Sequence, residues 1–176
     1  EILSNSEGIK SILKAANIKG EHVKAEDISF KVAPRINAVG RLDSPNIIIN
    51  LLTSTDNEVA EELASKCEKL NNKRKLLTKQ IEEEALEILQ KKNSSIPNFI
   101  LIAQSHWHSG VIGIVASKLI KHFNRPTALL AKDEKGNFRA SVRAPNWFSV
   151  SKSLSAVSEY MESYGGHDAA GGFTVK

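Results

Sequence analysis

The sequence has little sulfur and no long apolar run. Cys67 is the only cysteine among 176 residues, so no internal disulfide can form, which fits a reducing cytoplasm. Cys67 falls within a helical apolar pattern, and we interpret it as a core residue rather than a nucleophile. The longest apolar stretches, such as residues 99–103, are far too short to cross a membrane, and no signal peptide is visible. We therefore expect a cytoplasmic protein with no membrane partner.

A start methionine is also missing. The chain opens at Glu1, and its only methionine is Met161. Methionine is not normally removed before a bulky acidic residue, so we expect Glu1 to be an interior residue of a longer protein. The hydrophobic content of 41% is ordinary for a globular protein and sufficient for a core.

Positive charge is concentrated in the second half. Residues 1–98 hold 15 basic and 15 acidic residues, whereas residues 99–176 hold 9 basic and 5 acidic ones. The net charge of +4 therefore belongs to the C-terminal part. A mildly basic module suits a polyanionic ligand, although an excess of this size is a weak indication by itself.

Helical patterns dominate the first half of the chain. Ser6 is placed to cap a first helix. A second helical pattern starts near Ala25, and we expect Pro34 to interrupt it, because proline lacks the amide hydrogen that a helix requires. Pro45 suits the first position of a short helix.

The longest helix is expected to follow Asp56, which is placed to cap it, and to run to about Lys92. Its apolar positions recur every three or four residues, as in a packed helix, with a break at Arg74. These positions are Val59, Leu63, Cys67, Leu70, Leu77, Ile81, Ala85 and Ile88.

Strand patterns enter after residue 98. The expected order is a strand at 99–103, a helix at 111–123, strands at 127–131 and 138–142, a helix at about 150–161 and a final strand. This order predicts an α/β fold with a mixed sheet, preceded by helices that include one long connecting helix. The chain then divides into residues 1–55, the connecting helix at 56–92 and a domain at 99–176.

The end of the chain is rich in glycine around one histidine. Four of the ten glycines lie in residues 165–172. Gly165 and Gly166 allow close backbone approach to a ligand, and His167 can donate to a phosphate. We expect Gly165 to cap the preceding helix, whose last apolar residues should anchor the loop. The alternative is a plain turn.

A second candidate site opens the helix at 111–123. His108, Ser109 and Gly110 precede it, and the first amides of a helix stabilise a phosphate or carboxylate. The alternative is that Ser109 simply caps the helix. A zinc pair of His106 and His108 is disfavoured, because no cysteine or carboxylate flanks them.

Two further segments carry arginines suited to phosphate. Ser141 and Arg143 alternate on a strand, so their side chains share a face and form a candidate phosphate clamp. Arg35, Asn37 and Arg41 form a second polar segment. The alternatives are an exposed polar strand face and helix-end surface charges, respectively.

Aromatic residues near these segments are candidate base-stacking groups, because stacking on a nucleobase tolerates any sequence. Each one taken alone is more often a core or rim residue. Trp147, in a Pro-Asn-Trp-Phe loop, is expected to be the most exposed of them. The candidates are Trp107, Trp147, Phe148 and Tyr164.

Four motifs taken in order resemble the RecJ family, the single-stranded-DNA-specific exonucleases of the DHH phosphoesterase superfamily. The likeness covers nearly the whole chain. Its motifs are residues 34–41 (Pro-Arg-Ile-Asn-Ala-Val-Gly-Arg), residues 106–117, residues 139–143 (Arg-Ala-Ser-Val-Arg) and Gly165-Gly166-His167. The resemblance implies a linker helix plus a DHH-associated domain at 99–176. It departs from the family at His106, where an acidic residue is usual, and at residues 145–148, which are usually less aromatic.

The resemblance also implies roles for residues. In the family the Ser-x-Arg corresponding to Ser141 and Arg143 is associated with the 5′-terminal phosphate of the strand, and an arginine of the 34–41 segment reaches towards it. His167 would face two manganese or magnesium ions and contact the scissile phosphate. The ligands of those ions belong to an N-terminal DHH domain, and no Asp-His-His occurs here. We therefore expect no metal ligand in this chain.

These implications make the chain the substrate-binding half of a 5′→3′ single-stranded-DNA exonuclease of DNA repair and recombination, inactive by itself. One alternative is a DHH phosphodiesterase acting on short RNA or cyclic dinucleotides; such proteins generally lack the segment at 34–41 and the long helix. Another is a non-catalytic nucleic-acid-binding module. A purely structural coil is disfavoured by the break at Arg74.

Overall fold

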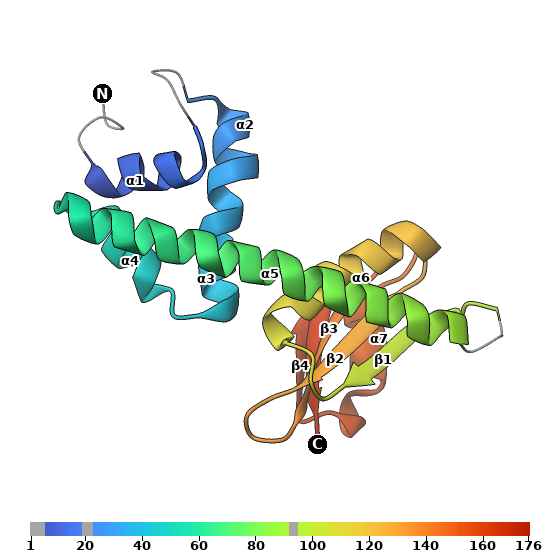
Figure 1. Cartoon of the computed structure of the whole chain (residues 1–176). Coiled ribbons are helices and arrows are strands. Elements are labelled where there is room, and N and C mark those ends of the chain that lie inside the picture. Colours follow the sequence, from blue (N-terminus) through green and yellow to red (C-terminus); the bar gives the residue numbers. More distant parts are fainter. Residues whose placement is uncertain (1–5, 19–22, 92–94) are drawn as a thin grey trace. The chain divides into compact units, whose positions relative to one another are not determined.

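Helices precede a mixed five-stranded sheet in the computed structural model, which describes residues 6–18, 23–91 and 95–176 (Figure 1). The predicted α/β fold with a mixed sheet is confirmed. The chain divides into two compact units, Glu1–Leu76 and Leu77–Lys176, which we call the helical unit and the sheet unit. The division falls inside the long helix, so the second part of that helix belongs with the sheet.

The helical unit begins as the sequence predicts. The Ser6 hydroxyl accepts a hydrogen bond from Ile9 N at 3.3 Å and caps the first helix. Pro45 stands directly before its helix, one position earlier than expected. The elements are α1 (Glu7–Ala15), α2 (Ala25–Asp27), the π-helical turn η2 (Ile28–Val32), α3 (Ala33–Leu42), α4 (Asn46–Thr53) and the first part of α5 (Asn57–Lys91).

Pro34 does not interrupt the second helix, which corrects the prediction. Helical backbone continues from α2 through η2 into α3. In η2 the Ala33 amide donates to Ile28 O, five residues back, which widens the turn just before the proline. Pro34 then occupies the first turn of α3, where a missing amide hydrogen costs least.

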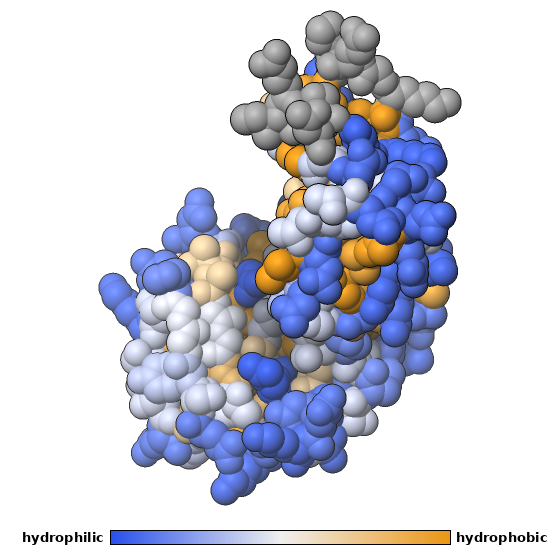
Figure 2. Space-filling model, turned by 90° about the vertical axis from the view of Figure 1, so that its left-hand side faces the viewer, coloured by the Kyte–Doolittle hydropathy of each residue, from blue (hydrophilic) through white to orange (hydrophobic). Residues whose placement is uncertain are grey.

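The core of the helical unit joins α1, α3, α4 and α5. Ile12, Val39, Leu51 and Cys67 are buried together there. Burial raises the pKa of the Cys67 thiol to about 11, so it stays protonated at neutral pH, as a core residue should. Some apolar side chains remain at the surface, and Figure 2 shows hydrophobic residues among hydrophilic ones on this unit. The exposed ones include Ile28, Phe30, Ile49 and Leu52.

Helix α5 is capped as predicted, and its apolar stripe is confirmed in part, because Cys67, Ile81 and Ala85 are buried. Asp56 Oδ1 accepts from Glu58 N at 2.8 Å and Val59 N at 3.2 Å. Val59 itself is exposed, and Lys92, the predicted last residue, lies outside the described residues. The apolar pattern overlooked alanines and polar side chains that pack equally well. The buried residues of α5 are Ala60, Ala64, Cys67, Asn71, Thr78, Ile81, Ala85 and Leu89.

The sheet unit orders its strands β1-β2-β3-β5-β4, with β1 and β2 parallel and every other pair antiparallel. Helix α6 connects β1 to β2 and lies against β2 and β3, whereas α7 packs on β4 and β5. Its elements are β1 (Ile100–Gln104), α6 (Ser109–Phe123), β2 (Thr127–Lys132), β3 (Phe138–Arg143), α7 (Val150–Ala156), η3 (Ser158–Tyr160), β4 (Ser163–Gly166) and β5 (Ala170–Val175). Among the described residues, no helix combines the length and apolar character that a membrane span requires.

Strand β4 was not predicted, and two expectations fail with it. Helix α7 ends at Ala156 instead of near Met161, and Gly165 lies in β4 instead of capping a helix. Met161 packs on the core, but Tyr160 is exposed. Glycine usually weakens a strand. Here it permits close pairing, because a Cβ at Gly171 would lie 2.8 Å from Gly165 O.

Candidate functional site

The Ser-x-Arg pair of β3 forms a joined polar group. Arg143 Nη1 donates to Ser141 Oγ at 3.2 Å and to Val142 O at 2.8 Å. Both side chains therefore share one strand face, as the alternation predicts. Helix α6 covers that face, and a Cβ at Gly113 would lie 2.6 Å from Ser141 Oγ and 3.0 Å from Arg143 Nη2. Glycine at position 113 leaves the room that the pair occupies.

The glycine-rich hairpin lies at the end of β3 that carries Arg143. Arg143 pairs with Ala170 in the β3–β5 register, and Ala144 N donates to Ala169 O at 3.0 Å. His167 is exposed on the turn between β4 and β5, where its amide donates to Ala170 O at 2.8 Å. The structure thus brings the Ser141–Arg143 pair and the His167 turn to one end of the sheet.

The two glycines before His167 differ in what they require. Gly166 has φ +148°, a conformation that favours glycine, and a side chain there would collide with the backbone of β5. A Cβ at Gly165 would meet nothing within 4 Å. The backbone conformation therefore requires glycine at position 166 but not at position 165, where the missing side chain leaves open space beside the turn.

Asp168 ties this turn to the start of α7. Its Oδ1 accepts from Ser149 Oγ at 2.6 Å and Ser151 Oγ at 2.8 Å, and Val150 N donates to Asp168 O at 2.9 Å. The hydrogen bonds from Ser149 and Ser151 lower the pKa of Asp168 below its ordinary value. Its carboxylate therefore stays ionised and keeps the turn in place at neutral pH.

The start of α6 lies elsewhere. His108 caps the helix, because its Nδ1 accepts from Gly110 N at 3.1 Å, and Ser109 is the first helical residue. This corrects the alternative that Ser109 is the cap. A groove of about 680 Å³ borders His108 and Ser109 and is also lined by Lys132 and Arg139. Arg139 is the second residue of β3, so this groove lies towards the opposite end of the strand from Arg143.

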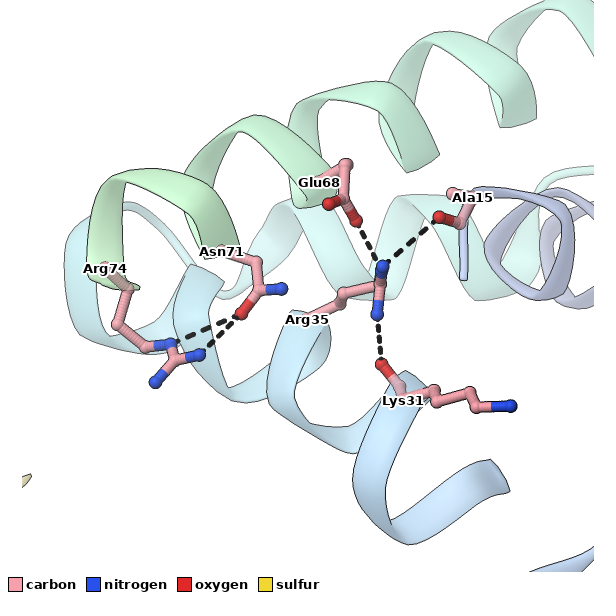
Figure 3. A network of polar contacts seen from close by, with 6 residues as sticks. All are labelled: Ala15, Lys31, Arg35, Glu68, Asn71 and Arg74. Atoms are coloured by element: carbon pink, nitrogen blue, oxygen red, sulfur yellow. Dashed lines mark hydrogen bonds and ion pairs between the residues drawn. The ribbon is translucent and has the colours of Figure 1, made fainter. Parts of the chain in front are cut away.

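Arg35 is held inside the helical unit (Figure 3). Its Nε pairs with Glu68, Nη1 donates to Lys31 O at 2.6 Å, and Nη2 donates to Ala15 O at 3.3 Å. Only 12% of the Arg35 side chain is exposed. One guanidinium thus connects α1, η2 and α5, which are far apart in sequence.

Asn37 and Arg41 lie exposed on α3. Arg74 of α5 is a further polar residue, which the motifs did not indicate as a candidate. Asn71 Oδ1 accepts from Arg74 Nε at 3.3 Å and Nη2 at 2.9 Å, as Figure 3 also shows. Burial lowers the pKa of Arg74, and the nearby charge of Arg41 lowers it further. The interruption of the apolar stripe at Arg74 was the available signal.

Within the sheet unit, α5 is fixed to the domain by two glutamates. Trp107 Nε1 donates to Glu84 Oε2 at 2.7 Å, His106 Nε2 lies 3.0 Å from the same oxygen, and Lys118 Nζ donates to Glu82 Oε2 at 2.6 Å. Burial alone would raise the pKa of Glu84, but the hydrogen bonds from Trp107 and His106 outweigh it and lower the value. Trp107 is buried, so it offers no ring for stacking.

No metal ligand set is found in the part of the chain that the structure describes. Among residues 6–18, 23–91 and 95–176, no three His, Cys, Asp or Glu side chains gather so that they could hold an ion. The donors present therefore do not fit a metal centre. His106 and His108, the pair considered for zinc, have the separate partners Glu84 and Gly110.

Comparison with known proteins finds a domain model and relatives that match this chain. Residues 96–176 match the DHHA1 domain. The chain is 36% identical over 174 residues to the single-stranded-DNA-specific exonuclease RecJ of Bacillus subtilis, covering 98% of this chain and 22% of the relative. With RecJ of Escherichia coli the identity is 31% over 176 residues, covering 96% and 30%. The chain thus spans less than a third of the length of these relatives.

Solved structures agree. A crystal structure of exonuclease RecJ bound to manganese matches 98% of this chain and 42% of that chain, with a TM-score of 0.85 and 28% identity. RecJ of Thermus thermophilus in complex with Mg²⁺ matches 97% and 26%, with a TM-score of 0.82 and 29% identity. The resemblance to RecJ that the four motifs indicate is confirmed.

Proposed function

Because residues 96–176 belong to the DHHA1 family and nearly the whole chain is related to part of RecJ, we propose that the chain binds single-stranded DNA for a nuclease. The nuclease hydrolyses the strand from its 5′ end, in DNA repair and recombination in the cytoplasm. This chain is its substrate-binding half. A DHH domain supplies the ligands of two manganese or magnesium ions, because the described residues offer none. Alone, the chain does not hydrolyse DNA.

The joined pair of Ser141 and Arg143 is the observation that carries this proposal. Arg143 is oriented by Ser141 Oγ and Val142 O before any ligand arrives. A guanidinium fork and a hydroxyl on one strand face match the oxygens of a terminal phosphate. We assign them to the terminal 5′-phosphate of the strand. The free end of a strand presents this group, and its interior does not.

His167 is assigned to the scissile phosphate. It lies exposed on a turn whose backbone is set by Gly166 and whose base is tied down by Asp168. A donor held in this way stabilises the charge that develops on a phosphate oxygen without reorganising. Gly165 leaves space at the same turn for the strand. In the full-length nuclease, which includes the DHH domain, replacing His167 by alanine should lower kcat far more than strand affinity.

The remaining candidates bind the strand away from the clamp. We assign Asn37 and Arg41 of α3, and His108, Ser109 and Gly110 at the start of α6, to contacts with the phosphate backbone. Arg35 differs, since each of its three nitrogens already has a partner within the helical unit. Its role in this proposal is to position α3, on which Asn37 and Arg41 lie.

The test compares two oligonucleotides that differ only at the 5′ end. The 176-residue chain is titrated with a single strand carrying a 5′-phosphate and with the same strand carrying a 5′-hydroxyl. Arg143→Ala should weaken the binding of the phosphorylated strand by about 10- to 150-fold. This is the loss expected when a charged hydrogen bond worth about 1.5–3 kcal/mol is removed. The hydroxyl strand should change much less. Arg143→Lys should restore little, because a point charge lacks the fork.

Arg139→Ala is the matched control, since Arg139 lies near the other end of the same strand. It should affect the two oligonucleotides equally. If Arg143→Ala also weakens both strands equally, the clamp does not recognise the 5′-phosphate. Tighter binding of a cyclic dinucleotide than of DNA would instead favour a phosphodiesterase of small substrates.

A further inference from the structure

The structure separates the aromatic residues near the site by exposure. Trp107 is 4% exposed and bonded to Glu84, whereas Trp147 is 58% exposed. Phe148 is half-buried against the core of α7 and the sheet. Trp147 is therefore the large aromatic ring of this loop that is presented to solvent.

A tight turn holds Trp147 in this position. Phe148 N donates to Pro145 O at 3.0 Å, which closes a turn with Trp147 at its third residue. The Trp147 ring meets Phe148 edge-on, with centroids 6.1 Å apart and planes at 88°. Phe148 in turn packs against Phe99, with centroids 5.8 Å apart. The indole packs against another aromatic ring, so fixing its orientation costs little further entropy when a ligand binds.

The turn is fastened at both ends to the hairpin that carries His167. Before it, Ala144 N donates to Ala169 O at 3.0 Å. After it, Val150 N donates to Asp168 O at 2.9 Å and Ser149 Oγ donates to the Asp168 carboxylate at 2.6 Å. Residues 145–148 therefore form a loop fixed beside the proposed contact with the scissile phosphate.

The same end of the sheet carries the proposed clamp. One row of the register runs from Ile100 through Thr127 and Arg143 to Ala170. Trp147 follows Arg143 by four residues, so their Cα atoms lie within about 14 Å, which is about four nucleotides at a rise of 3.4 Å. Arg125 and Lys152 flank the ends of the same segments. An exposed indole at the end of the sheet that carries Arg143 favours a strand of nucleic acid over an apolar partner.

We propose that the indole of Trp147 stacks on a nucleobase of the single strand whose phosphates are held at Arg143 and His167. This inference rests on the proposed function, and it adds a contact to the base that the phosphate groups cannot provide. Stacking requires only a π face, so it recognises the base of any nucleotide and not its sequence. It also requires an unpaired base, and the contact therefore selects single strands over duplexes.

The experiment uses the full chain and two single strands of equal length and charge, oligodeoxythymidylate and an abasic analogue. Wild-type Trp147 fluorescence should be quenched by the oligodeoxythymidylate and much less by the abasic strand. Trp147→Ala should weaken the binding of oligodeoxythymidylate by about 5- to 140-fold, which corresponds to about 1–3 kcal/mol per stacked base. It should leave the affinity for the abasic strand unchanged. Trp147→Phe should recover part of the loss.

Tyr160→Ala is the matched control, because Tyr160 is 74% exposed and precedes β4 at the end far from Gly166. It should leave both affinities unchanged. Equal loss on both strands in Trp147→Ala would mean that the ring only supports the fold. Unchanged affinity and fluorescence would mean that the indole faces another partner, such as a protein. If wild type binds neither strand, the proposed function fails together with the stacking.

Discussion

The two units of the chain use arginine in opposite ways. In the helical unit, Arg35 is paired with the carboxylate of Glu68 and two backbone carbonyls, and its side chain is 12% exposed. In the sheet unit, Arg143 is hydrogen-bonded to two neutral acceptors, the Ser141 hydroxyl and the Val142 carbonyl. Both arginines stand in motifs that read as phosphate sites. The first is thus held by a carboxylate and two carbonyls of other elements, whereas a hydroxyl and a carbonyl of its own strand help to orient the second.

The contrast extends to what surrounds each arginine. Helices converge on Arg35, so its removal would leave Glu68 and two carbonyls without their donor. Helix α6 passes over Arg143 at a glycine, and the end of the guanidinium lies where a side chain at that position would reach. An arginine in a phosphate motif must therefore be judged by its partners.

Replacing Arg35 by methionine should cause the largest effect on stability. The change keeps much of the stem but removes three hydrogen bonds, one of them charged, and we expect a loss of about 1–3 kcal/mol. Thermal unfolding followed by far-ultraviolet circular dichroism measures it. Both tryptophans belong to the sheet unit, so their fluorescence should still report a folded sheet.

A loss of DNA affinity in Arg35→Met that exceeds the loss on replacing both Asn37 and Arg41 by alanine would contradict a positioning role, because a displaced α3 could not account for it. Glu68→Gln is its partner control. It keeps an acceptor but removes the charge, and it should destabilise the helical unit less than Arg35→Met.

Gly113→Ala should separate stability from binding in the sheet unit. The new Cβ would displace Ser141 Oγ and the end of Arg143, both of which can rotate away. Alanine stabilises a helix by about 1 kcal/mol relative to glycine, and this gain offsets the cost of displacing the two side chains. The melting temperature should therefore change little. The orientation of the clamp should suffer, and we expect affinity for a 5′-phosphorylated strand to fall by about tenfold.

Gly40→Ala provides the control for this change. Gly40 lies within α3, where a Cβ would meet nothing within 4 Å, so the helix should gain stability without any loss of affinity. Should Gly113→Ala bind the phosphorylated strand as tightly as wild type, the space over the clamp has no bearing on the ligand.

The smallest expected effect concerns pH and the His167 turn. The pKa of Asp168 is lowered by its bonds from Ser149 and Ser151, relative to an ordinary value of 3.8. A carboxylate with a lowered folded-state pKa stabilises the fold above its unfolded value, and this contribution is lost as the pH falls through the folded value. Asp168→Asn should therefore melt below wild type at pH 7, and the difference should shrink as the pH falls below 3.8 and vanish once the pH lies below the lowered folded-state pKa. A difference that is constant with pH would show that the charge has no part in holding the turn.

Much of the local structure could be predicted because it depends on neighbouring residues. Ser6 and Asp56 cap their helices as the pattern indicates, and the strand–helix–strand order after residue 98 is found. Alternation alone placed Ser141 and Arg143 on one face. The family motifs predicted a DHH-associated domain at 99–176, and residues 96–176 match the DHHA1 domain.

The failures arise where distant residues decide the outcome. A proline that predicts a helix end is accommodated by a π-helical turn, and a glycine pair that predicts a loop becomes a strand because β5 lies so close. The side-chain partners of Glu84, and Glu68 as the ion-pair partner of Arg35, lie more than twenty residues away, so no local pattern indicates them. Aromatic exposure was likewise decided by packing, which buried Trp107 and left Trp147 at the surface.

The buried thiol of Cys67 has a practical consequence for chemical labelling. The side chain is 0% exposed and its pKa is raised to about 11, so maleimides and similar reagents should react with it only after the helical unit opens. A cysteine introduced at an exposed position of the sheet unit can then carry a dye without removing the native one. The rate at which Cys67 itself reacts then reports the opening of the helical unit. Tryptophan emission from the sheet unit does not register this opening.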